Sequence, residues 1–394
     1  MDRKGIVILL VIGIVSGFLC LDQSAAASSE TILTDLQEID QQLLSLLKTR
    51  KYEQLDSRIR AYVRSYEADP LHEKYLNVAF EVFSRNLPAL EPLLTEWISK
   101  QPKSYAAYAA RGIYYIRVGA TKPDSKVTNE TTVKQLEGML FYFNKAMRDL
   151  DKAYSINPRF INALCYEMLI LPAYGERDKL RQLRDKGLAL NPSNSALRWT
   201  YISILLPRWG GSIEEMQKEI ESARPYYAKN PDLKGLEGRI LAEYGDQAHF
   251  FEGDDQKAIQ FYNKALQYGD HPFYHFQRGV AYSSNNQFDL CINDMDIAIQ
   301  QRPNNPPAYF FRGYAKHRLQ RYNESIVDLT KSIDDDPYED KAWFTRGNSY
   351  TFLGKNDLAL ADYEKAVALS PDNSQYLNAR GSMKKQVQKK SNER

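Results

Sequence analysis

Small and aromatic residues recur at helical spacing within residues 340–373. One stripe consists of Trp343, Gly347 and Tyr350. Residues three or four positions apart share one face of an α-helix, so this stripe predicts a first helix. After a polar turn, a second stripe consists of Ala359, Tyr363 and Ala366. Pro371 ends the second helix because proline cannot continue it, and the two apolar stripes together predict a helical hairpin.

The same markers return every 34 residues towards the C-terminus. The set consists of Arg278, Arg312, Arg346 and Arg380; Gly279, Gly313, Gly347 and Gly381; Asp294, Asp328 and Asp362; and Pro303, Pro337 and Pro371. Four markers in one register indicate an array of repeats, which offers extended binding surfaces rather than an enclosed catalytic cavity. Gly347 lies inside its helix despite a propensity cost of about 1 kcal/mol, so a second helix is expected to approach closely there.

This pattern resembles the tetratricopeptide repeat, whose signature combines an aromatic residue, a Leu-Gly pair, tyrosine, alanine, a second aromatic residue and proline within about 34 residues. The unit 340–373 matches at nearly every position, although arginine replaces the leucine there and in the two preceding units. Units 272–305 and 306–339 match less closely. Their further departures from the signature are Cys291, Ser325 and Lys316.

The resemblance is close over residues 272–381, moderate over 232–271 and distant over 31–231. Further second helices upstream would be closed by Pro70, Pro102, Pro158, Pro192 and Pro231. The resemblance implies an all-α fold, a right-handed α-solenoid of about nine helix-turn-helix repeats. The expected divisions are a signal peptide at 1–27, divergent repeats at 28–231, clearer repeats at 232–373, and a capping helix with a basic tail at 374–394.

Two insertions interrupt the array. Residues 119–132 carry almost no apolar side chains and are expected to form a solvated loop before a long helix at about 133–156. The segment from Gly245 to Asp255 is expected to lengthen one helix pair. The stretch Pro207–Ser212 also resembles a W-G-G-S loop of uncharacterised bacterial repeat proteins, a resemblance that implies no known activity.

Arginine at the leucine position of the signature faces other helices and therefore needs a partner. Aspartate keeps the same period, so the sequence predicts one Arg–Asp pair per repeat, within a unit or with its neighbour. The residues concerned are Arg278, Asp294, Arg312, Asp328, Arg346 and Asp362. Surface charge without pairing is the other interpretation.

The resemblance also implies a concave groove, lined by positions 2, 5, 9 and 12 of the first helices. Carried over to this chain, the candidate binding residues are Phe273, Phe276, Val280, Pro307, Phe310, Tyr314, His317, Lys341, Phe344 and Asn348. Exposed aromatic residues in a row favour a binding surface, although some of them could instead contact the neighbouring helix. Only Lys341 and Asn348 would qualify for the clamp that chaperone-binding repeats use on a C-terminal carboxylate.

One loop could hold an anion. Gly210 and Gly211 precede a capping box that begins at Ser212, so their amides would lie at a helix N-terminus, with Arg208 nearby. The other interpretation is a glycine turn with Trp209 packed into the array.

The N-terminus has the pattern of a targeting segment. Arg3 and Lys4 precede an apolar run at residues 5–21, and three alanines that end at Ala27 provide a cleavage site. Export to the periplasm or the exterior, with cleavage after Ala27, is therefore expected. Residues 5–21 would otherwise anchor the chain in a membrane, and Cys20 lacks the small preceding residues that lipid modification requires.

The remaining composition offers little chemistry. Lys and Arg number 52 against 50 Asp and Glu, so no general electrostatic attraction to nucleic acid is expected. Cys165 and Cys291 fall in different repeats and are expected to be free, buried thiols. His271 and His275 have a spacing that could bind a metal on a helix, but packing is the preferred interpretation. No cofactor or metal is expected.

The sequence therefore favours a non-catalytic, exported scaffold that holds other proteins in the cell envelope. Two alternatives stay open. Aromatic rings in a groove also stack on sugars, which would suit a polysaccharide-binding protein in polymer export, and the divergent residues 31–231 could hide an enzyme site.

Overall fold

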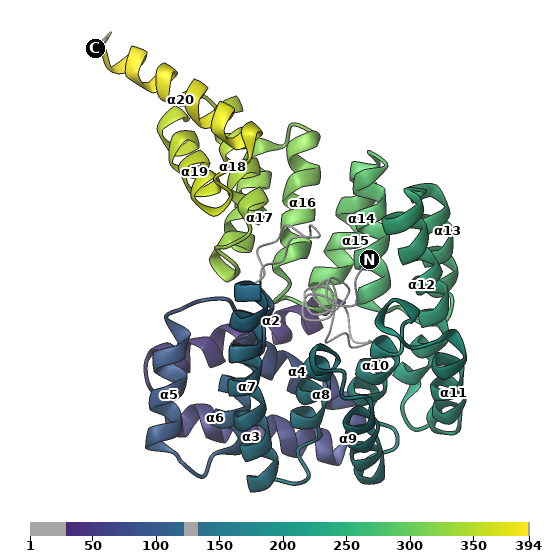
Figure 1. The fold of residues 1–394 in the computed structure, drawn as a ribbon. Helices are drawn as coiled ribbons and strands as arrows, with labels where there is room; N and C mark the ends of the chain where they lie inside the picture. Colours follow the sequence, from purple (N-terminus) through teal and green to yellow (C-terminus); the bar gives the residue numbers. More distant parts are fainter. Residues whose placement is uncertain (1–28, 122–132, 393–394) are drawn as a thin grey trace. The chain divides into compact units, whose positions relative to one another are not determined.

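A computed structural model describes residues 29–121 and 133–392 (Figure 1). All regular structure within these two ranges is helical, and they contain no strand. The α-helices are α2 (Ser29–Lys48), α3 (Tyr52–Ala68), α4 (Glu73–Glu81), α5 (Leu90–Lys100), α6 (Tyr105–Thr121), α7 (Val133–Ile156), α8 (Ile161–Ile170), α9 (Arg177–Leu190), α10 (Ser195–Ile204), α11 (Ile213–Ala223), α12 (Arg239–Gln247), α13 (Asp255–Ala265), α14 (Pro272–Ser284), α15 (Phe288–Gln301), α16 (Pro306–Arg318), α17 (Tyr322–Asp335), α18 (Asp340–Phe352), α19 (Asn356–Leu369) and α20 (Ser374–Asn392).

Short helical segments join several of these helices. The 3₁₀ segments are η1 (Pro70–His72), η2 (Val82–Ser84), η3 (Leu171–Tyr174), η4 (Pro207–Trp209), η5 (Arg224–Tyr226) and η6 (Pro231–Gly238), and η7 (Ala248–Glu252) is a π-helix. The chain forms two compact units. The first runs to Tyr274 and includes Gln300–Asn304, and the second consists of His275–Ile299 and Asn305–Arg394.

The second unit is built from hairpins that share one turn geometry. Asn286, Gln320 and Gly354 are spaced by the repeat period and adopt positive φ values of 59°, 62° and 69°. After each of these residues, the next amide donates to a carbonyl five residues earlier, as Lys355 N does to Tyr350 O at 2.9 Å. This bond closes the C-terminus of a first helix and directs the chain into the second.

Glycine lets the two helices of each hairpin approach closely. A Cβ at Gly279 would lie 2.7 Å from Met295 Cε, and one at Gly313 would lie 2.8 Å from Leu329 Cγ. At Gly347 the nearest atom would be Cε1 of Tyr363, again at 2.8 Å. The in-helix glycines therefore mark the contact line between first and second helices.

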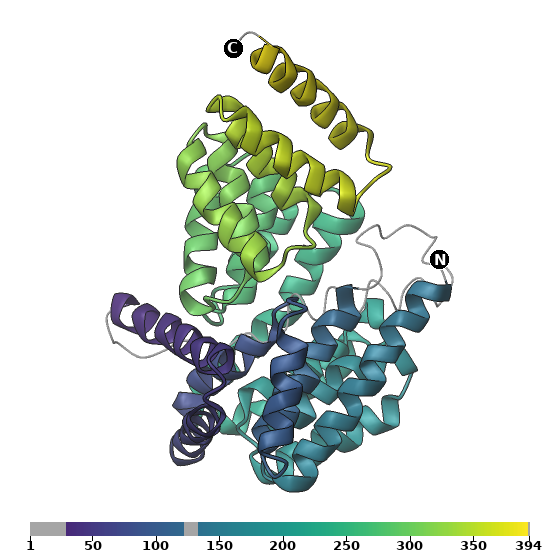
Figure 2. The same ribbon diagram turned by 90° about the vertical axis from the view of Figure 1, so that its left-hand side faces the viewer.

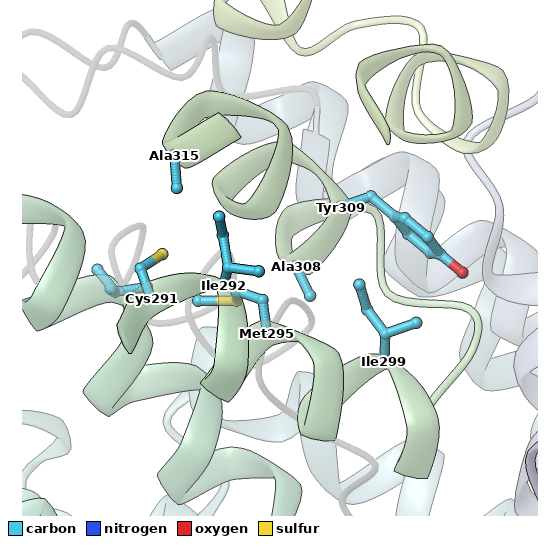
Figure 3. Packing of buried hydrophobic residues seen from close by; sticks show 8 residues of the cluster. Cys291, Ile292, Met295, Ile299, Ala308, Tyr309 and Ala315 are labelled. Atoms are coloured by element: carbon cyan, nitrogen blue, oxygen red, sulfur yellow. The ribbon is translucent and has the colours of Figure 1, made fainter. Parts of the chain in front are cut away.

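Apolar side chains fill the space between successive hairpins of this unit. From α15, Ile292, Met295 and Ile299 meet Ala308 and Tyr309 of α16 in a buried cluster (Figure 3). The next cluster joins Leu329 and Ile333 of α17 to Ala342 of α18, and two further clusters join α18 and α19 to α20. Each hairpin thus buries its apolar face against its neighbour, as a stack of helical repeats requires.

The first unit, whose helices are coloured purple to teal in Figure 2, uses the same turn and glycine contact in some of its hairpins. Arg50, between α2 and α3, has a positive φ of 57°, and the following amide donates to Leu46 O at 2.9 Å. Between α6 and α7, the close contacts lie at Gly112 and Gly119, where a Cβ would meet Leu150 at 3.0 Å and Phe143 at 2.7 Å. These hairpins therefore follow the packing rule of the C-terminal repeats.

The structure differs from the expected course of the first insertion. α6 continues to Thr121, so residues 119–121 are helical rather than part of a loop, and 122–132 lie outside the described residues. α7 spans the range that the sequence predicts for a long helix. The second insertion extends α12 through the π-helix η7, which ends at Gly253 with a φ of 70°.

Distant residues tie the first unit together through buried polar contacts. Glu73 accepts hydrogen bonds from the backbone amides of Ser195 and Ala196, both at 3.1 Å, and so closes the N-terminus of α10. Arg302, in the short segment that joins this unit, pairs with Glu81 at 2.9 Å. None of the described helices is both long enough and apolar enough to span a bilayer.

Gly347 and Gly381 occupy equivalent repeat positions, but replacing them with alanine is expected to change the free energy of unfolding in opposite directions. Gly347→Ala is expected to lower the free energy of unfolding by about 1–2 kcal/mol, because overpacking against the Tyr363 ring outweighs the gain in helix propensity. Gly381→Ala in α20 is expected to raise it by up to about 1 kcal/mol, because a Cβ there would meet nothing within 4 Å. Guanidinium unfolding followed by far-UV circular dichroism measures both, and changes of equal sign would contradict the packing assignment.

Candidate functional site

Each C-terminal repeat contains one bidentate Arg–Asp pair that joins its first and second helices. Arg346 Nε and Nη2 donate to the two carboxylate oxygens of Asp362, both at 2.8 Å. The equivalent bonds are Arg278 to Asp294 at 2.8 and 2.7 Å, and Arg312 to Asp328 at 2.9 and 2.6 Å. All three of these pairs lie within a repeat, and Arg312 also pairs with Asp296 of the preceding repeat at 2.5 Å.

Burial makes these pairs energetically important. The aspartates are nearly inaccessible and the arginines retain 13–19% of their side-chain exposure. Burial alone would lower the pKa of Arg312 and Arg346, but the hydrogen bonds to Asp328 and Asp362 raise it above its ordinary value. A charged arginine in this position therefore depends on its carboxylate.

A fourth pair of the same kind lies in the first unit. Arg111 donates to both oxygens of Asp149 at 2.7 and 2.9 Å, next to the close contact of Gly112 with Leu150. The two charged residues are 38 positions apart, against 16 in the C-terminal repeats. The insertion between α6 and α7 conceals this spacing, which is why the sequence analysis missed the pair. The Arg-Gly and Asp-Leu dipeptides were the available signal.

The candidate groove residues are not brought together as one exposed row. Phe273 belongs to the first unit, where its ring meets Trp199 edge-on at 6.3 Å and lies under the Arg239 guanidinium. Val280 is buried in the second unit. The half-buried rings pack on apolar clusters between helices; they are Phe276, Phe310 and Phe344. These rings contribute to repeat packing, which is the second of the two interpretations that the sequence allowed.

Lys341 and Asn348 do not form a carboxylate clamp in the described structure. Lys341 is exposed, whereas the amide oxygen of Asn348 accepts a hydrogen bond from the Tyr363 hydroxyl at 2.8 Å. Pro307 is half-buried in the first turn of α16. The polar pair that captures a terminal carboxylate is therefore not assembled.

A group of half-buried aromatic rings around one exposed phenylalanine lies instead at the helix turns of the second unit. We define the ring surface as Tyr314, His317, Tyr322 and Phe352. Phe352 is 65% exposed and its ring stacks on Tyr322 at 4.9 Å with an interplanar angle of 2°. His317 contacts both of these rings, with centroid distances of 5.5 and 5.8 Å.

Polar contacts hold the ring surface in place. His317 Nδ1 lies 2.9 Å from Ser349 Oγ, and burial, followed by the charge of Arg318, lowers the pKa of His317. Both effects favour the neutral form of the imidazole. Arg318 also donates to the Tyr314 hydroxyl at 2.8 Å, and its guanidinium lies 4.6 Å from the centroid of Phe288. Tyr322 starts a second helix and Phe352 ends a first helix. Both therefore lie outside the four groove positions and were not predicted as site residues.

The loop proposed as an anion site uses its polar groups internally. Arg208 pairs with Asp246 at 2.5 Å and Glu243 at 3.1 Å. The amides of Gly210 and Gly211 donate to carbonyls of the preceding turn at 3.0 and 3.2 Å. Ser212 Oγ accepts from the Glu215 amide at 3.1 Å, as its capping box predicts. These contacts favour the glycine turn, and the anion site stays a prediction.

Glycine is required at position 211 for packing, because a Cβ there would lie 2.0 Å from Leu205 O.

The two histidines whose spacing could suit a metal are also packed against other side chains. His271 stacks on Trp199 at 3.7 Å, and His275 bonds to Asp294 at 2.8 Å. No group of three or more metal-ligating side chains occurs in the described part of the chain. Cys165 and Cys291 are buried and free, and burial raises the pKa of Cys291 to about 12.

Hairpins of a fixed period, closed by left-handed turns and by glycine contacts, define a helical-repeat protein. Residues 340–373 match the family model described as Tetratricopeptide repeat. Residues 340–373 are therefore assigned to the tetratricopeptide repeat family. Its members are generally non-catalytic, and their fold suggests a scaffold for protein–protein interaction.

Three solved structures illustrate the similarity. The Arabidopsis OM64 TPR domain is 25% identical and covers 29% of this chain and 95% of its own length, with a TM-score of 0.29. MamA from Desulfovibrio magneticus RS-1 is 18% identical over 39% of this chain and 86% of its own, with a TM-score of 0.36. YrrB, described as a TPR protein with an unusual peptide-binding site, is 17% identical over 59% and 97%, with a TM-score of 0.31. No curated protein matches this chain.

The Arg–Asp pairs lead to a stability prediction. Asp328→Ala would leave Arg312 and Lys316 without the carboxylate that both contact, so the free energy of unfolding is expected to fall by roughly 3 kcal/mol. Asp334→Ala, at an exposed position of the same helix, is expected to change it by less than about 0.5 kcal/mol. Guanidinium unfolding compares the two variants, and equal unfolding midpoints would show that the pair is dispensable.

Proposed function

We propose that this chain is an interaction scaffold that binds internal segments of other proteins on the ring surface of its C-terminal repeats. The observation that carries the proposal is the exposed ring of Phe352, which stacks on half-buried Tyr322 beside His317. Hydration of an exposed phenylalanine ring is unfavourable, and a partner that covers the ring removes it from water, so apolar rings in a cluster are typical of a binding surface.

The polar groups of the ring surface suit a peptide backbone. Tyrosine hydroxyls and a neutral imidazole can donate to and accept from amides, whereas the rings accommodate apolar side chains. Arg318 already donates to the Tyr314 hydroxyl and Asn348 is engaged by Tyr363, so the described residues of this surface do not present a prearranged clamp for a terminal carboxylate. An internal, extended segment therefore fits better than a chain terminus.

A display selection of peptides on the full chain tests this proposal. Tyr314→Ala and Phe352→Ala are each expected to weaken a selected peptide by about tenfold or more, because each variant removes an aromatic anchor. Val327→Ala is the control, since this side chain is 69% exposed on α17 outside the ring surface. Amidation of the peptide C-terminus is expected to leave its affinity unchanged.

Two results would contradict the proposal. Affinities that are unaffected by both ring variants would place binding elsewhere. Retention on a polysaccharide matrix with the same dependence on the rings, without peptide binding, would support the sugar-binding alternative instead. Circular dichroism of each variant confirms that the repeats remain folded.

We further propose that the scaffold acts outside the cytoplasm. The support is the sequence of residues 1–27, which lie outside the described residues, with Arg3 and Lys4 before the apolar run and alanines before the expected cleavage site. Mass spectrometry of the chain expressed with its own leader is expected to find a mature N-terminus at Ser28 in the exported fraction. An intact Met1 in the cytosolic fraction would contradict export, and an intact, membrane-bound chain would indicate an anchor.

A further inference from the structure

Helix α20 carries the same chemistry, in the same register, as the first helix α16. In α16 the residues are Arg312, Gly313 and Lys316. Two periods of the repeat later, α20 places Arg380, Gly381 and Lys384. α20 therefore has the face that a first helix presents to its second helix.

The function of this face is visible in α16. Arg312 and Lys316 both donate to the carboxylate of Asp328 on α17, at 2.6–2.9 Å. Gly313 provides room for Leu329, the next residue of α17, which lies 2.8 Å from the position of a Cβ. The two cations and the glycine thus recognise an acidic residue followed by an apolar residue on a helix.

In α20 the same face is uncovered in the described structure. Gly381 is exposed and a Cβ there would meet no atom within 4 Å, in contrast to the glycines of the three preceding repeats. Neither Arg380 nor Lys384 has a carboxylate partner among the described residues. Another side of α20 is packed, with Tyr376 against Phe344 at 4.6 Å and Met383 in the cluster with Tyr363.

Charge specifies what could cover this face. The span Ser374–Asn392 contains no Asp or Glu, and its cations include Arg380, Lys384 and Lys385. An acidic ligand is therefore complementary to it. The lysines would attract an anionic membrane, but that attraction does not depend on the missing side chain at Gly381. The missing side chain allows close approach of a helix, so the combination favours a helix.

We propose that α20 is a second interaction surface, which docks an acidic amphipathic helix of a partner protein. The partner helix lies where α17 lies on α16. An aspartate of the partner bridges Arg380 and Lys384, and the apolar residue after it covers Gly381. This surface is independent of the ring surface, and the binding of peptides there could fail without affecting it.

The chain provides its own probe for this surface. A fluorescein-labelled peptide of residues 322–335, the α17 sequence, carries four acidic residues and one lysine, and includes Asp328 and Leu329. Titration of the full chain is followed by fluorescence anisotropy. Saturable binding is expected, and Arg380→Glu and Gly381→Trp are each expected to weaken it by about tenfold or more.

Matched controls separate docking from general attraction. Lys365→Glu makes the same charge change at an exposed position of α19 and is expected to leave the affinity unchanged. A peptide with Asp328→Lys is expected to bind the native chain weakly and to regain affinity for the Arg380→Asp chain. Circular dichroism of the α20 variants is expected to match the native chain because the altered positions are at least partly exposed.

Four results would overturn the proposal. The first is no saturable binding at the highest soluble peptide concentration. The second is equal binding by the Arg380→Glu chain. In the third, vesicles of anionic phospholipid bind with dependence on Arg380 but not on Gly381, which would assign the face to a membrane. In the fourth, analytical ultracentrifugation of the chain alone shows dimers that Arg380→Glu abolishes, which would make a second copy the occupant.

Discussion

The close approach of two helices over a glycine, secured by a buried Arg–Asp pair, is the interaction on which the repeats depend. The glycine removes the side chain that would hold the helices apart, and their approach then buries the neighbouring arginine. A buried guanidinium requires a carboxylate at bidentate distance, which the second helix provides. Packing and charge pairing therefore act together, and each fixes the same register between the two helices.

This arrangement explains how one device serves hairpins with different connections. In the first unit, Arg111 and Asp149 meet across an insertion, beside the contact of Gly112 with Leu150. The length of the loop between the two helices does not affect this contact, because the arginine, the aspartate and the glycine all lie on the helices. For the same reason a helix from another molecule could meet these groups on α20.

The sequence could predict the hairpins and the Arg–Asp partners because both depend on local spacing within one period. The groove was harder to predict. The four groove positions of the tetratricopeptide repeat predict the side of the helix on which Phe310 or Phe344 lies. They do not predict which neighbouring side chains cover that ring. The ring surface depends on a contact between Tyr322 and Phe352, which start and end different helices, and no single-helix pattern reveals it.

The divergent half was less predictable for a related physical reason. Arg208 looked available for an anion because its partner Asp246 lies 38 residues away, beyond any recognisable period. Where the hairpins differ in length, the contacts between them cannot be predicted from a fixed residue spacing. Composition nevertheless placed the apolar residues inside, and Cys165 and Cys291 are buried and free as their separation suggested.

A double-mutant cycle on Arg346 and Asp362 tests the central claim most directly. Unfolding free energies are measured for the native chain, for Arg346→Met, for Asp362→Leu and for the double variant. The account predicts a coupling free energy of roughly 1–3 kcal/mol between the two side chains, with the double variant more stable than the sum of the single losses implies. Additive losses, with a coupling near zero, would show that the hairpins are held by apolar packing alone and would contradict the account.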